Sequence, residues 1–85
     1  MASYNIVIKP SAVKELERIP KKDRIRVANR IRTLADDPRP HGHQKLSGQE
    51  RYRVRQGVYR IIYSIEDVVR IVQIVKIAHR GEAYS

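Results

Sequence analysis

The chain of 85 residues contains no cysteine. A disulfide framework, a thiolate metal site, an iron–sulfur cluster and a cysteine nucleophile are therefore excluded. Phenylalanine and tryptophan are also absent, so the five tyrosines are the only aromatic residues. A chain of this length has room for one domain, which we expect to span residues 1–85. It buries only roughly 60–65% of its unfolded surface, so we expect a modest core.

Acidic residues are few: 9 Asp and Glu stand against 18 Lys and Arg, which gives a formal net charge of +9. This excess favours phosphate-rich partners or an acidic protein partner. The most apolar stretch, residues 68–78, is interrupted by Arg70, Gln73 and Lys76 and is too short to cross a bilayer. The first residues do not have the pattern of a signal peptide. We therefore expect a cytoplasmic protein.

The spacing of apolar residues predicts two helices after a first strand. Residues 4–9 are typical of a short strand. Residues 11–19 and 23–35 carry apolar residues at helical spacing, with Ser11 and Asp23 as the expected N-caps. The apolar stripe predicted for the second helix comprises Ile25, Ala28, Ile31, Leu34 and Ala35.

Three more strands are predicted after a loop at residues 38–48. Residues 51–56 and 58–65 alternate around a glycine, which is typical of a β-hairpin. Residues 68–78 follow a turn at Glu66 and Asp67 and form the last strand. The order β-α-α-β-β-β predicts an α+β fold in which a helical hairpin packs on one face of a mostly antiparallel sheet.

The hairpin gathers arginines. Alternation along a strand puts Arg51, Arg53 and Arg55 on one face. Arg60 lies opposite Arg53 or Arg55, depending on which two residues form the turn, and shares their face in either register. Directly opposed like charges destabilise a sheet by up to roughly 1 kcal/mol each, and residues 51–65 contain no acid. A solvated basic face is one interpretation, but the uncompensated repulsion favours an anionic ligand, because guanidinium groups grip phosphate oxygens.

The same alternation extends to the last strand and the residues after it. It places Gln73 opposite Arg60 and His79 further along the same face. Arg80 and Tyr84 follow directly, so we expect an imidazole, a guanidinium and a phenol beside the hairpin arginines. The alternative for these last residues is a frayed polar terminus.

Six segments carry a family resemblance. In chain order they are AVKEL (12–16), DPRP (37–40), KLSG (45–48), YRVR (52–55), GVYRIIY (57–63) and HRGEAY (79–84). Together they resemble the RelE/ParE superfamily of bacterial toxins, more specifically its RelE-like ribonuclease branch. The resemblance covers nearly the whole chain and implies a sheet like that of microbial ribonucleases.

The resemblance also implies an activity and partners. It implies the toxin of a type II toxin–antitoxin system, an mRNA interferase that cleaves mRNA in the ribosomal A site and inhibits translation. Cleavage of this kind leaves 2′,3′-cyclic phosphate and 5′-OH ends and requires no metal or other cofactor. The implied partners are a RelB-like antitoxin that blocks the activity, the ribosome and mRNA. Two alternatives stay open: a ParE-like toxin that inhibits DNA gyrase, and a non-catalytic basic RNA-binding module.

Carried over by position, the catalytic residues of the family fall on basic residues and one tyrosine. To these we add a histidine, since it is the only nearby group that titrates close to neutrality. The expected catalytic residues are Arg53, Arg55, Arg60, Arg80, His79 and Tyr84. Further RNA contacts are expected from Arg51, Lys45 and Gln73. Which group accepts the 2′-OH proton and which donates to the leaving oxygen stays open between His79 and Tyr84.

Overall fold

Two helices and five strands make up the part of the chain that the structure describes, residues 3–80. In this computed structural model they are β1 (Asn5–Ile8), α1 (Pro10–Glu17), α2 (Lys21–Asp36), β2 (Gln44–Lys45), β3 (Tyr52–Gln56), β4 (Tyr59–Glu66) and β5 (Ile71–His79). The predicted α+β fold is confirmed, with one addition. The strand β2 lies inside the segment predicted as a loop, because two residues are too few to show an alternating pattern.

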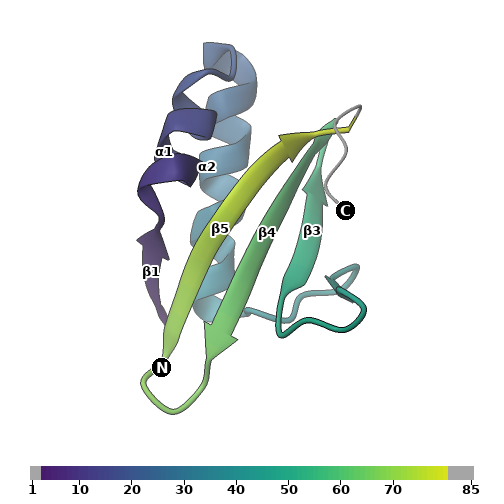
Figure 1. The fold of residues 1–85 in the computed structure, drawn as a ribbon. Coiled ribbons are helices and arrows are strands. Elements are labelled where there is room, and N and C mark those ends of the chain that lie inside the picture. Colours follow the sequence, from purple (N-terminus) through teal and green to yellow (C-terminus); the bar gives the residue numbers. More distant parts are fainter. Residues whose placement is uncertain (1–2, 81–85) are drawn as a thin grey trace.

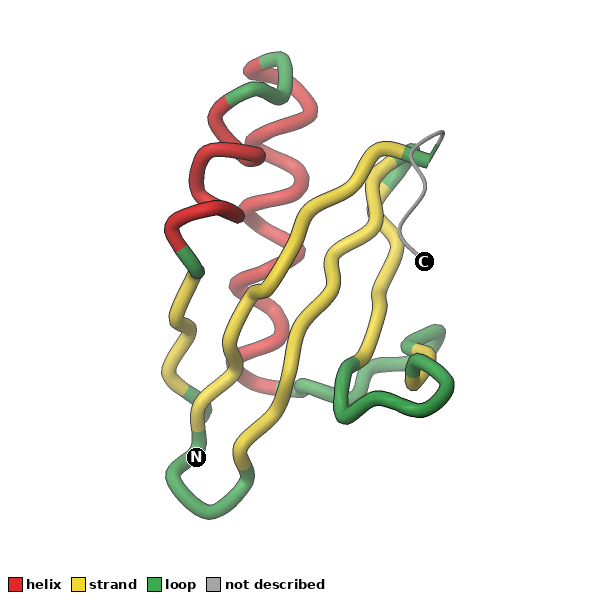
Figure 2. The backbone as a smooth tube through the Cα atoms, viewed as in Figure 1, coloured by secondary structure: helices red, strands yellow, loops and turns green. Residues whose placement is uncertain are grey.

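The strands form one sheet in the order β1-β5-β4-β3-β2. β1 runs parallel to β5, and the other neighbouring strands are antiparallel. Both helices lie against the same side of the sheet (Figure 1). Figure 2 shows the long connection from α2 to β3, which contains β2, passing beneath the end of β3. We call the side that the helices cover the helix face, and the side on which Arg53, Arg55 and Arg60 lie the arginine face.

Both helices begin earlier than predicted. α1 begins at Pro10, whose fixed φ suits a first helical position, and α2 begins directly after Pro20. Ser11 and Asp23 therefore lie inside the first turns rather than at the N-caps. Asp23 still places a negative charge near the positive end of the α2 dipole. Neither helix is long and apolar enough to cross a membrane, as judged over residues 3–80.

The core lies between the helices and the sheet. Its buried residues are Ala12, Ile19, Val27, Ile31, Leu34, Val54, Ile61, Tyr63, Val72, Ile74 and Ile77. Val27 takes the place predicted for Ile25, which is 50% exposed. Tyr63 is fully buried, and its hydroxyl donates to the carbonyl oxygen of Pro38 at 2.7 Å. Burial raises the pKa of Tyr63 to about 12, so this hydroxyl remains a donor well above neutral pH.

A β-bulge divides β5. Ile62 pairs with Lys76, whereas the next residue, Tyr63, pairs with Ile74, so Val75 is an extra residue in β5. Because side chains alternate with a period of two, one extra residue exchanges the two faces. The residues beyond the bulge therefore point to the faces opposite to those that an unbroken strand predicts.

The turn between β4 and β5 is longer than predicted. β4 continues to Glu66, and residues 67–70 form the turn before β5 begins. Arg70 adopts a φ of 55°, in the left-handed region that residues other than glycine seldom occupy. Val68, predicted to open the last strand, is 96% exposed in this turn. Its β-branched side chain favours a strand locally, but Val68 lies in the turn because the chain reverses direction at Arg70.

Glu15 of α1 closes the edge of β5 where its pairing with β1 has ended. That pairing ends at Ile74. Beyond it, Oε1 of Glu15 accepts the backbone N–H of Ile77 at 2.9 Å, and Oε2 accepts from Nζ of Lys76 at 2.8 Å. A partly buried N–H without an acceptor would be costly. One carboxylate therefore completes the sheet edge and fixes α1 against β5.

Candidate functional site

The centre of the arginine face is a pair of opposed arginines. Arg55 of β3 lies directly opposite Arg60 of β4, which decides between the two registers that the sequence allows. The turn residues are Gly57 and Val58, and Gly57 has a φ of 60°, which costs glycine no steric strain. Because opposed residues point to the same face, the two guanidinium groups occupy one surface and repel each other.

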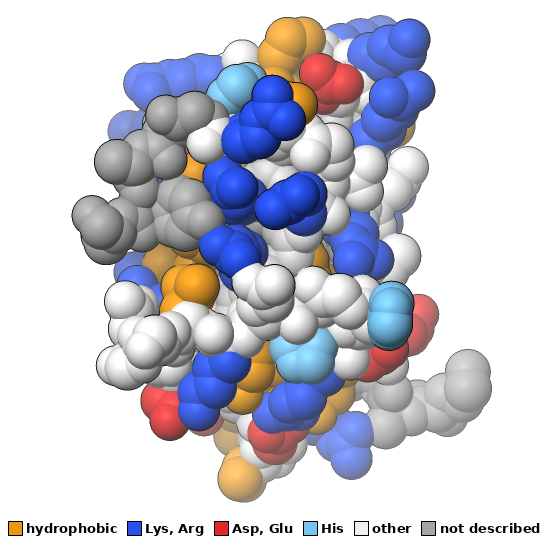
Figure 3. Space-filling view, turned by 90° about the vertical axis from the view of Figure 1, so that its right-hand side faces the viewer, with side chains coloured by type: hydrophobic (Ala, Val, Ile, Leu, Met, Phe, Trp, Pro, Cys, Tyr) orange, Lys and Arg blue, Asp and Glu red, His pale blue; other side chains and the backbone are white. Residues whose placement is uncertain are grey.

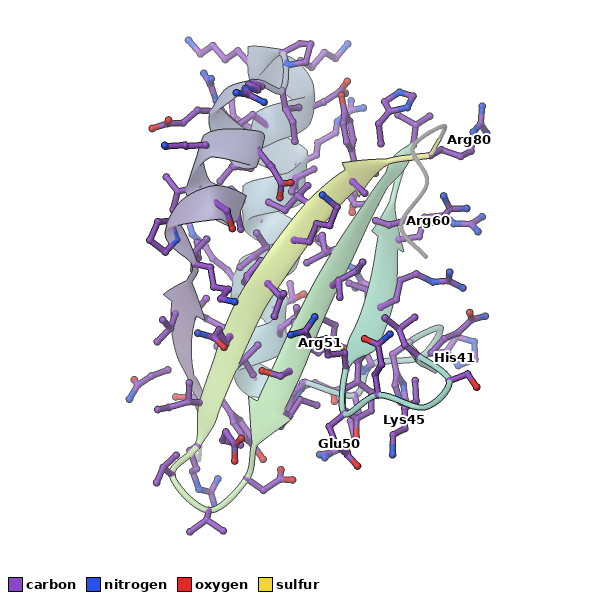
Figure 4. The ribbon with its side chains drawn as sticks, viewed as in Figure 1. His41, Lys45, Glu50, Arg51, Arg60 and Arg80 are labelled. Atoms are coloured by element: carbon purple, nitrogen blue, oxygen red, sulfur yellow. The ribbon has the colours of Figure 1, made fainter. Side chains whose placement is uncertain are left out.

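Arg60 also contacts the chain that leaves β5. Its Nη1 donates to the backbone oxygen of Arg80 at 3.1 Å, and the backbone N–H of Arg80 donates to the carbonyl oxygen of Val58 at 2.6 Å. Figure 4 shows the side chains of Arg60 and Arg80 projecting from the same end of the sheet. The structure therefore places Arg80 next to Arg60, as the sequence predicts.

Arg53 lies further along the same face and has a partner from β2. It is opposite Gln44, and its Nη2 donates to Oε1 of that side chain. Gln44 carries no signal in the sequence, because a two-residue strand inside a loop leaves no pattern from which its orientation could be predicted. The amide oxygen restricts the guanidinium of Arg53 to one direction.

The arginine face concentrates positive charge. Figure 3 shows several Lys and Arg side chains gathered in the middle of this side of the molecule, with further basic and acidic side chains towards its edges. The group draws on β3, β4 and the residue after β5 through Arg53, Arg55, Arg60 and Arg80. Arginine is charged at every physiological pH and presents donors in a planar fork, so this surface suits phosphate oxygens.

Two of the residues predicted to contact RNA lie away from this group. Lys45 is opposite Tyr52 and thus on the side of the helix face, and its Nζ lies 3.5 Å from Oε2 of Glu50. Arg51 precedes β3 and is exposed. In Figure 4, Lys45 and Glu50 lie at the opposite end of the sheet from Arg80. These side chains therefore lie apart from Arg60 and Arg80.

Gln73 lies on the predicted face but not opposite the predicted residue. It pairs with Ser64, whereas the partner of Arg60 is Ala78. The prediction that Gln73 lies opposite Arg60 is wrong, because the turn before β5 is longer than two residues and the bulge shifts the register. Gln73 is therefore displaced along the face, away from Arg60.

His79 is not on the arginine face. It pairs with Tyr59, and its ring meets the Tyr59 ring edge-on with 5.5 Å between the centroids. The prediction that His79 shares a face with the arginines is wrong, because Val75 reverses the alternation of β5. Tyr84, the other group predicted to transfer protons, lies outside the described residues.

A second cluster joins three segments at the far end of the sheet. The carboxylate of Asp67 accepts two hydrogen bonds from Arg39, at 3.0 and 3.2 Å, and one from the hydroxyl of Tyr4 at 2.7 Å. Arg39 and then Tyr4 lower the pKa of Asp67, and the same hydrogen bond raises the pKa of Tyr4. Arg39 also lies over the ring of Tyr52, 5.5 Å from its centroid. This cluster ties the segment after α2 to the turn after β4.

His43, in the loop after α2, has structural contacts. Nδ1 of His43 lies 2.8 Å from the carbonyl oxygen of Pro40, and its ring packs against Tyr52. Within residues 3–80, no group of three or more His, Cys, Asp or Glu side chains is arranged to hold a metal ion.

Comparison with known families identifies the family to which the chain belongs. A family model described as the ParE toxin of the type II toxin–antitoxin system parDE matches residues 6–84. The chain belongs to the RelE/ParE toxin superfamily. The matched range includes both helices, β2 to β5 and all of β1 except Asn5, so the match to this RelE/ParE toxin extends over the residues of the arginine face.

Solved structures support the same assignment. A RelE–RelB complex from Pyrococcus horikoshii OT3 contains a chain that is 32% identical, with a TM-score of 0.83, covering 95% of this chain and 99% of that one. The toxin–antitoxin complex RelBE2 from Mycobacterium tuberculosis matches with 23% identity and a TM-score of 0.83, over 92% and 99% of the two chains. The isolated E. coli RelE toxin matches with 19% identity and a TM-score of 0.82, over 95% and 88%. The last two matches show the fold alone. Among curated proteins, none matches this RelE/ParE toxin significantly.

Proposed function

We propose that this RelE/ParE toxin is a metal-independent endoribonuclease that cleaves mRNA in the ribosomal A site and so inhibits translation. The observation that supports this most directly is the convergence of Arg55, Arg60 and Arg80 on one surface. Opposed arginines reduce stability, and an RNA phosphate between them would turn the repulsion into binding. The proposal places the toxin in the cytoplasm, where mRNA and ribosomes are.

The chemistry requires charge stabilisation above all. The ribose 2′-OH attacks the adjacent phosphorus, the bond to the 5′ oxygen breaks, and a 2′,3′-cyclic phosphate and a 5′-OH remain. Negative charge develops on the phosphoryl oxygens, and fixed guanidinium groups aimed at them lower the barrier. Arg60 and Arg80 are assigned to these oxygens, and Arg53 and Arg55 to the phosphate backbone beside them.

Proton transfer needs a different residue type. Arginine does not release its proton near neutral pH, so the four arginines cannot serve as a base. The side chain of His79 lies across the sheet from the arginines. This placement of His79 favours Tyr84 as the group that transfers a proton.

The proposed partner that controls the toxin is an acidic, RelB-like antitoxin. The net charge of +9 favours an acidic ligand, and the similar structures from P. horikoshii and M. tuberculosis are a RelE–RelB complex and a RelBE2 toxin–antitoxin complex. We propose that the antitoxin lies across the arginine face and blocks it. The ribosome and mRNA are the partners of the free toxin.

Mapping of mRNA 5′ ends after expression of the toxin tests the proposal. New 5′-OH ends within translated codons are expected, and they should vanish when ribosomes are removed by an inhibitor of initiation. The second candidate, a ParE-like inhibitor of DNA gyrase, is favoured by the name of the matching family model. That candidate predicts stalled gyrase–DNA complexes and an unchanged pattern of mRNA ends, so one experiment separates the two.

A further inference from the structure

A cavity of about 270 Å³ lies on the helix face, between α1 and the end of the sheet that carries the arginine pair. It is lined by Glu15, Arg18, Ile19, Tyr59, Ile77 and His79. None of the arginines of the arginine face lines it. Its position follows from the β-bulge, because Ile77 and His79 point to the helix face only as a result of the extra residue in β5.

The walls of this cavity combine aromatic rings with a cation. Tyr59 and His79 meet at right angles, and Ile19 and Ile77 beneath them are 6% and 4% exposed. Arg18 is exposed at the rim. Flat rings over an apolar floor suit a planar heterocycle, and the guanidinium suits a phosphate attached to it.

The one acid in the cavity does not oppose an anionic ligand strongly. Both oxygens of Glu15 are engaged, one by Nζ of Lys76 and the other by the backbone N–H of Ile77. The ion pair with Lys76 compensates the carboxylate charge. Arg18 at the rim then supplies the positive charge that a ligand meets.

The groove continues on the other side of Tyr59. A second cavity of about 190 Å³ is lined by Asp23, Arg26, Gln56, Gly57, Val58 and Tyr59. Tyr59 is thus a wall shared by two adjoining hollows, and Arg18 and Arg26 flank it from α1 and α2. A strip with an aromatic centre, flanked by two arginines and with Asp23 in the second hollow, therefore runs along the end of the sheet.

This strip adjoins the arginine face. Tyr59 and Arg60 are consecutive, as are His79 and Arg80, and in each pair one side chain serves the cavity and the other the arginine face. Among residues 3–80, the end of the sheet separates the two. A single-stranded chain that leaves Arg60 and Arg80 reaches the cavity by passing over the Gly57 turn.

We propose that the cavity of Tyr59 and His79 is a subsite for an unpaired nucleobase of RNA, next to the phosphodiester held on the arginine face. This inference rests on the proposed ribonuclease function and extends it. Base stacking on aromatic side chains is sequence-tolerant. The subsite therefore orients the RNA strand and selects for an unstacked nucleotide at this position.

Binding of short RNA to the purified full-length toxin tests the subsite. The probe is a fluorescent 2′-O-methyl RNA hexanucleotide, which lacks the attacking hydroxyl, and a series in which each position in turn is abasic. At one position, loss of the base is expected to weaken binding to the wild type by about 5-fold or more. In His79→Ala that position is expected to lose its effect, and the intact RNA binds as weakly as the abasic one.

The chain offers matched controls. His41→Ala removes an exposed histidine from the loop at the far end of the sheet and is expected to keep the wild-type abasic profile. Arg18→Ala is compared with Arg32→Ala, which removes the same charge from an exposed position on α2. Only Arg18→Ala is expected to weaken the position-dependent effect. If His79→Ala fails to fold, ring resonances of His79 and His41 in the wild type are followed during RNA titration, and only those of His79 should shift.

Three results would overturn the subsite. One is an abasic profile that is flat in the wild type, and another is a profile unchanged in His79→Ala. The third is a His79→Ala variant that binds RNA normally but loses affinity for the antitoxin, which would make the cavity a protein site. The ribonuclease proposal fails by a different result, namely full toxicity and unchanged mRNA ends in Arg60→Ala, so the two failures are distinguishable.

Discussion

Arg55 and Arg60 face each other across β3 and β4, in an arrangement that the sheet itself does not need. Opposed like charges cost up to roughly 1 kcal/mol, and neither strand supplies an acid within residues 51–65 to offset this. A pair of threonines or an ion pair at these two positions would stabilise the pairing of β3 with β4 more. The arginines therefore make sense at this position as ligands for an anion.

Replacing Arg60 tests this reasoning at a single residue. Arg60→Ala is expected to abolish toxicity on expression, because the central cation of the proposed site is removed. The melting temperature should hold or rise, since relief of repulsion from Arg55 offsets the lost hydrogen bond to the Arg80 carbonyl oxygen. Arg32→Ala is the matched control and should stay toxic. A folded Arg60→Ala variant as toxic as the wild type, or an unfolded one, would refute the assignment.

Tyr63 gives a prediction for alkaline pH. Its pKa is raised to about 12 in the folded protein by burial, against 10.0 for an unperturbed tyrosine. Between these values the unfolded chain has lost the proton and the folded chain has kept it, so the free energy of unfolding falls as pH rises. The loss amounts to about 2–3 kcal/mol in total.

The matched variant for this effect is Tyr63→Phe. At pH 7 it is expected to be less stable than the wild type by about 1 kcal/mol, because the carbonyl oxygen of Pro38 loses its donor. From about pH 11 the order should reverse, since the wild type has by then lost more than about 1 kcal/mol and the phenylalanine variant has no proton to lose at this position. Urea unfolding from pH 7 to 11.5 measures both, and parallel curves for the two proteins would contradict the prediction.

At the scale of elements, α1 contributes to the sheet through one carboxylate. Glu15→Ala removes the acceptor of the Ile77 N–H and the partner of Lys76, and we expect it to cost about 1–3 kcal/mol in urea unfolding. Glu17→Ala, on an exposed position of the same helix, should change stability by less than about 0.5 kcal/mol. Equal effects of the two substitutions would show that the edge contact does not stabilise the fold.

The strands and helices show which features the sequence could predict. The fold class and the shared face of Arg53, Arg55 and Arg60 could be predicted from the strict alternation of the strands. The three arginines share a face in either register of the hairpin. The face of His79 does not, because one extra residue at Val75 reverses it and no local pattern marks a bulge between equally apolar positions. The partners of Asp67 could not be predicted either, because Tyr4 and Arg39 come from distant parts of the sequence.

For the whole molecule, a net charge of +9 attracts RNA to every surface, so affinity alone cannot identify the site. The salt dependence separates general attraction from specific contacts. Each phosphate contact to a single strand contributes about 0.7 to the slope of log K against log salt concentration. Residues that grip a phosphate should therefore lower the slope when they are removed, whereas a distant surface charge should leave it nearly unchanged.

The slope is measured from binding of the 2′-O-methyl hexanucleotide at roughly 50 to 300 mM KCl. Arg55→Ala and Arg80→Ala are each expected to reduce the slope by about 0.7. The double variant is expected to reduce it by about 1.4, because Arg55 lies on β3, Arg80 follows β5, and the two side chains hold separate phosphate oxygens. Arg32→Ala, on the exposed side of α2, should change the slope by much less. If Arg32→Ala lowers the slope as much as Arg80→Ala, RNA binds over the whole basic surface, and the arginine face loses its distinction as the place where the phosphate is held.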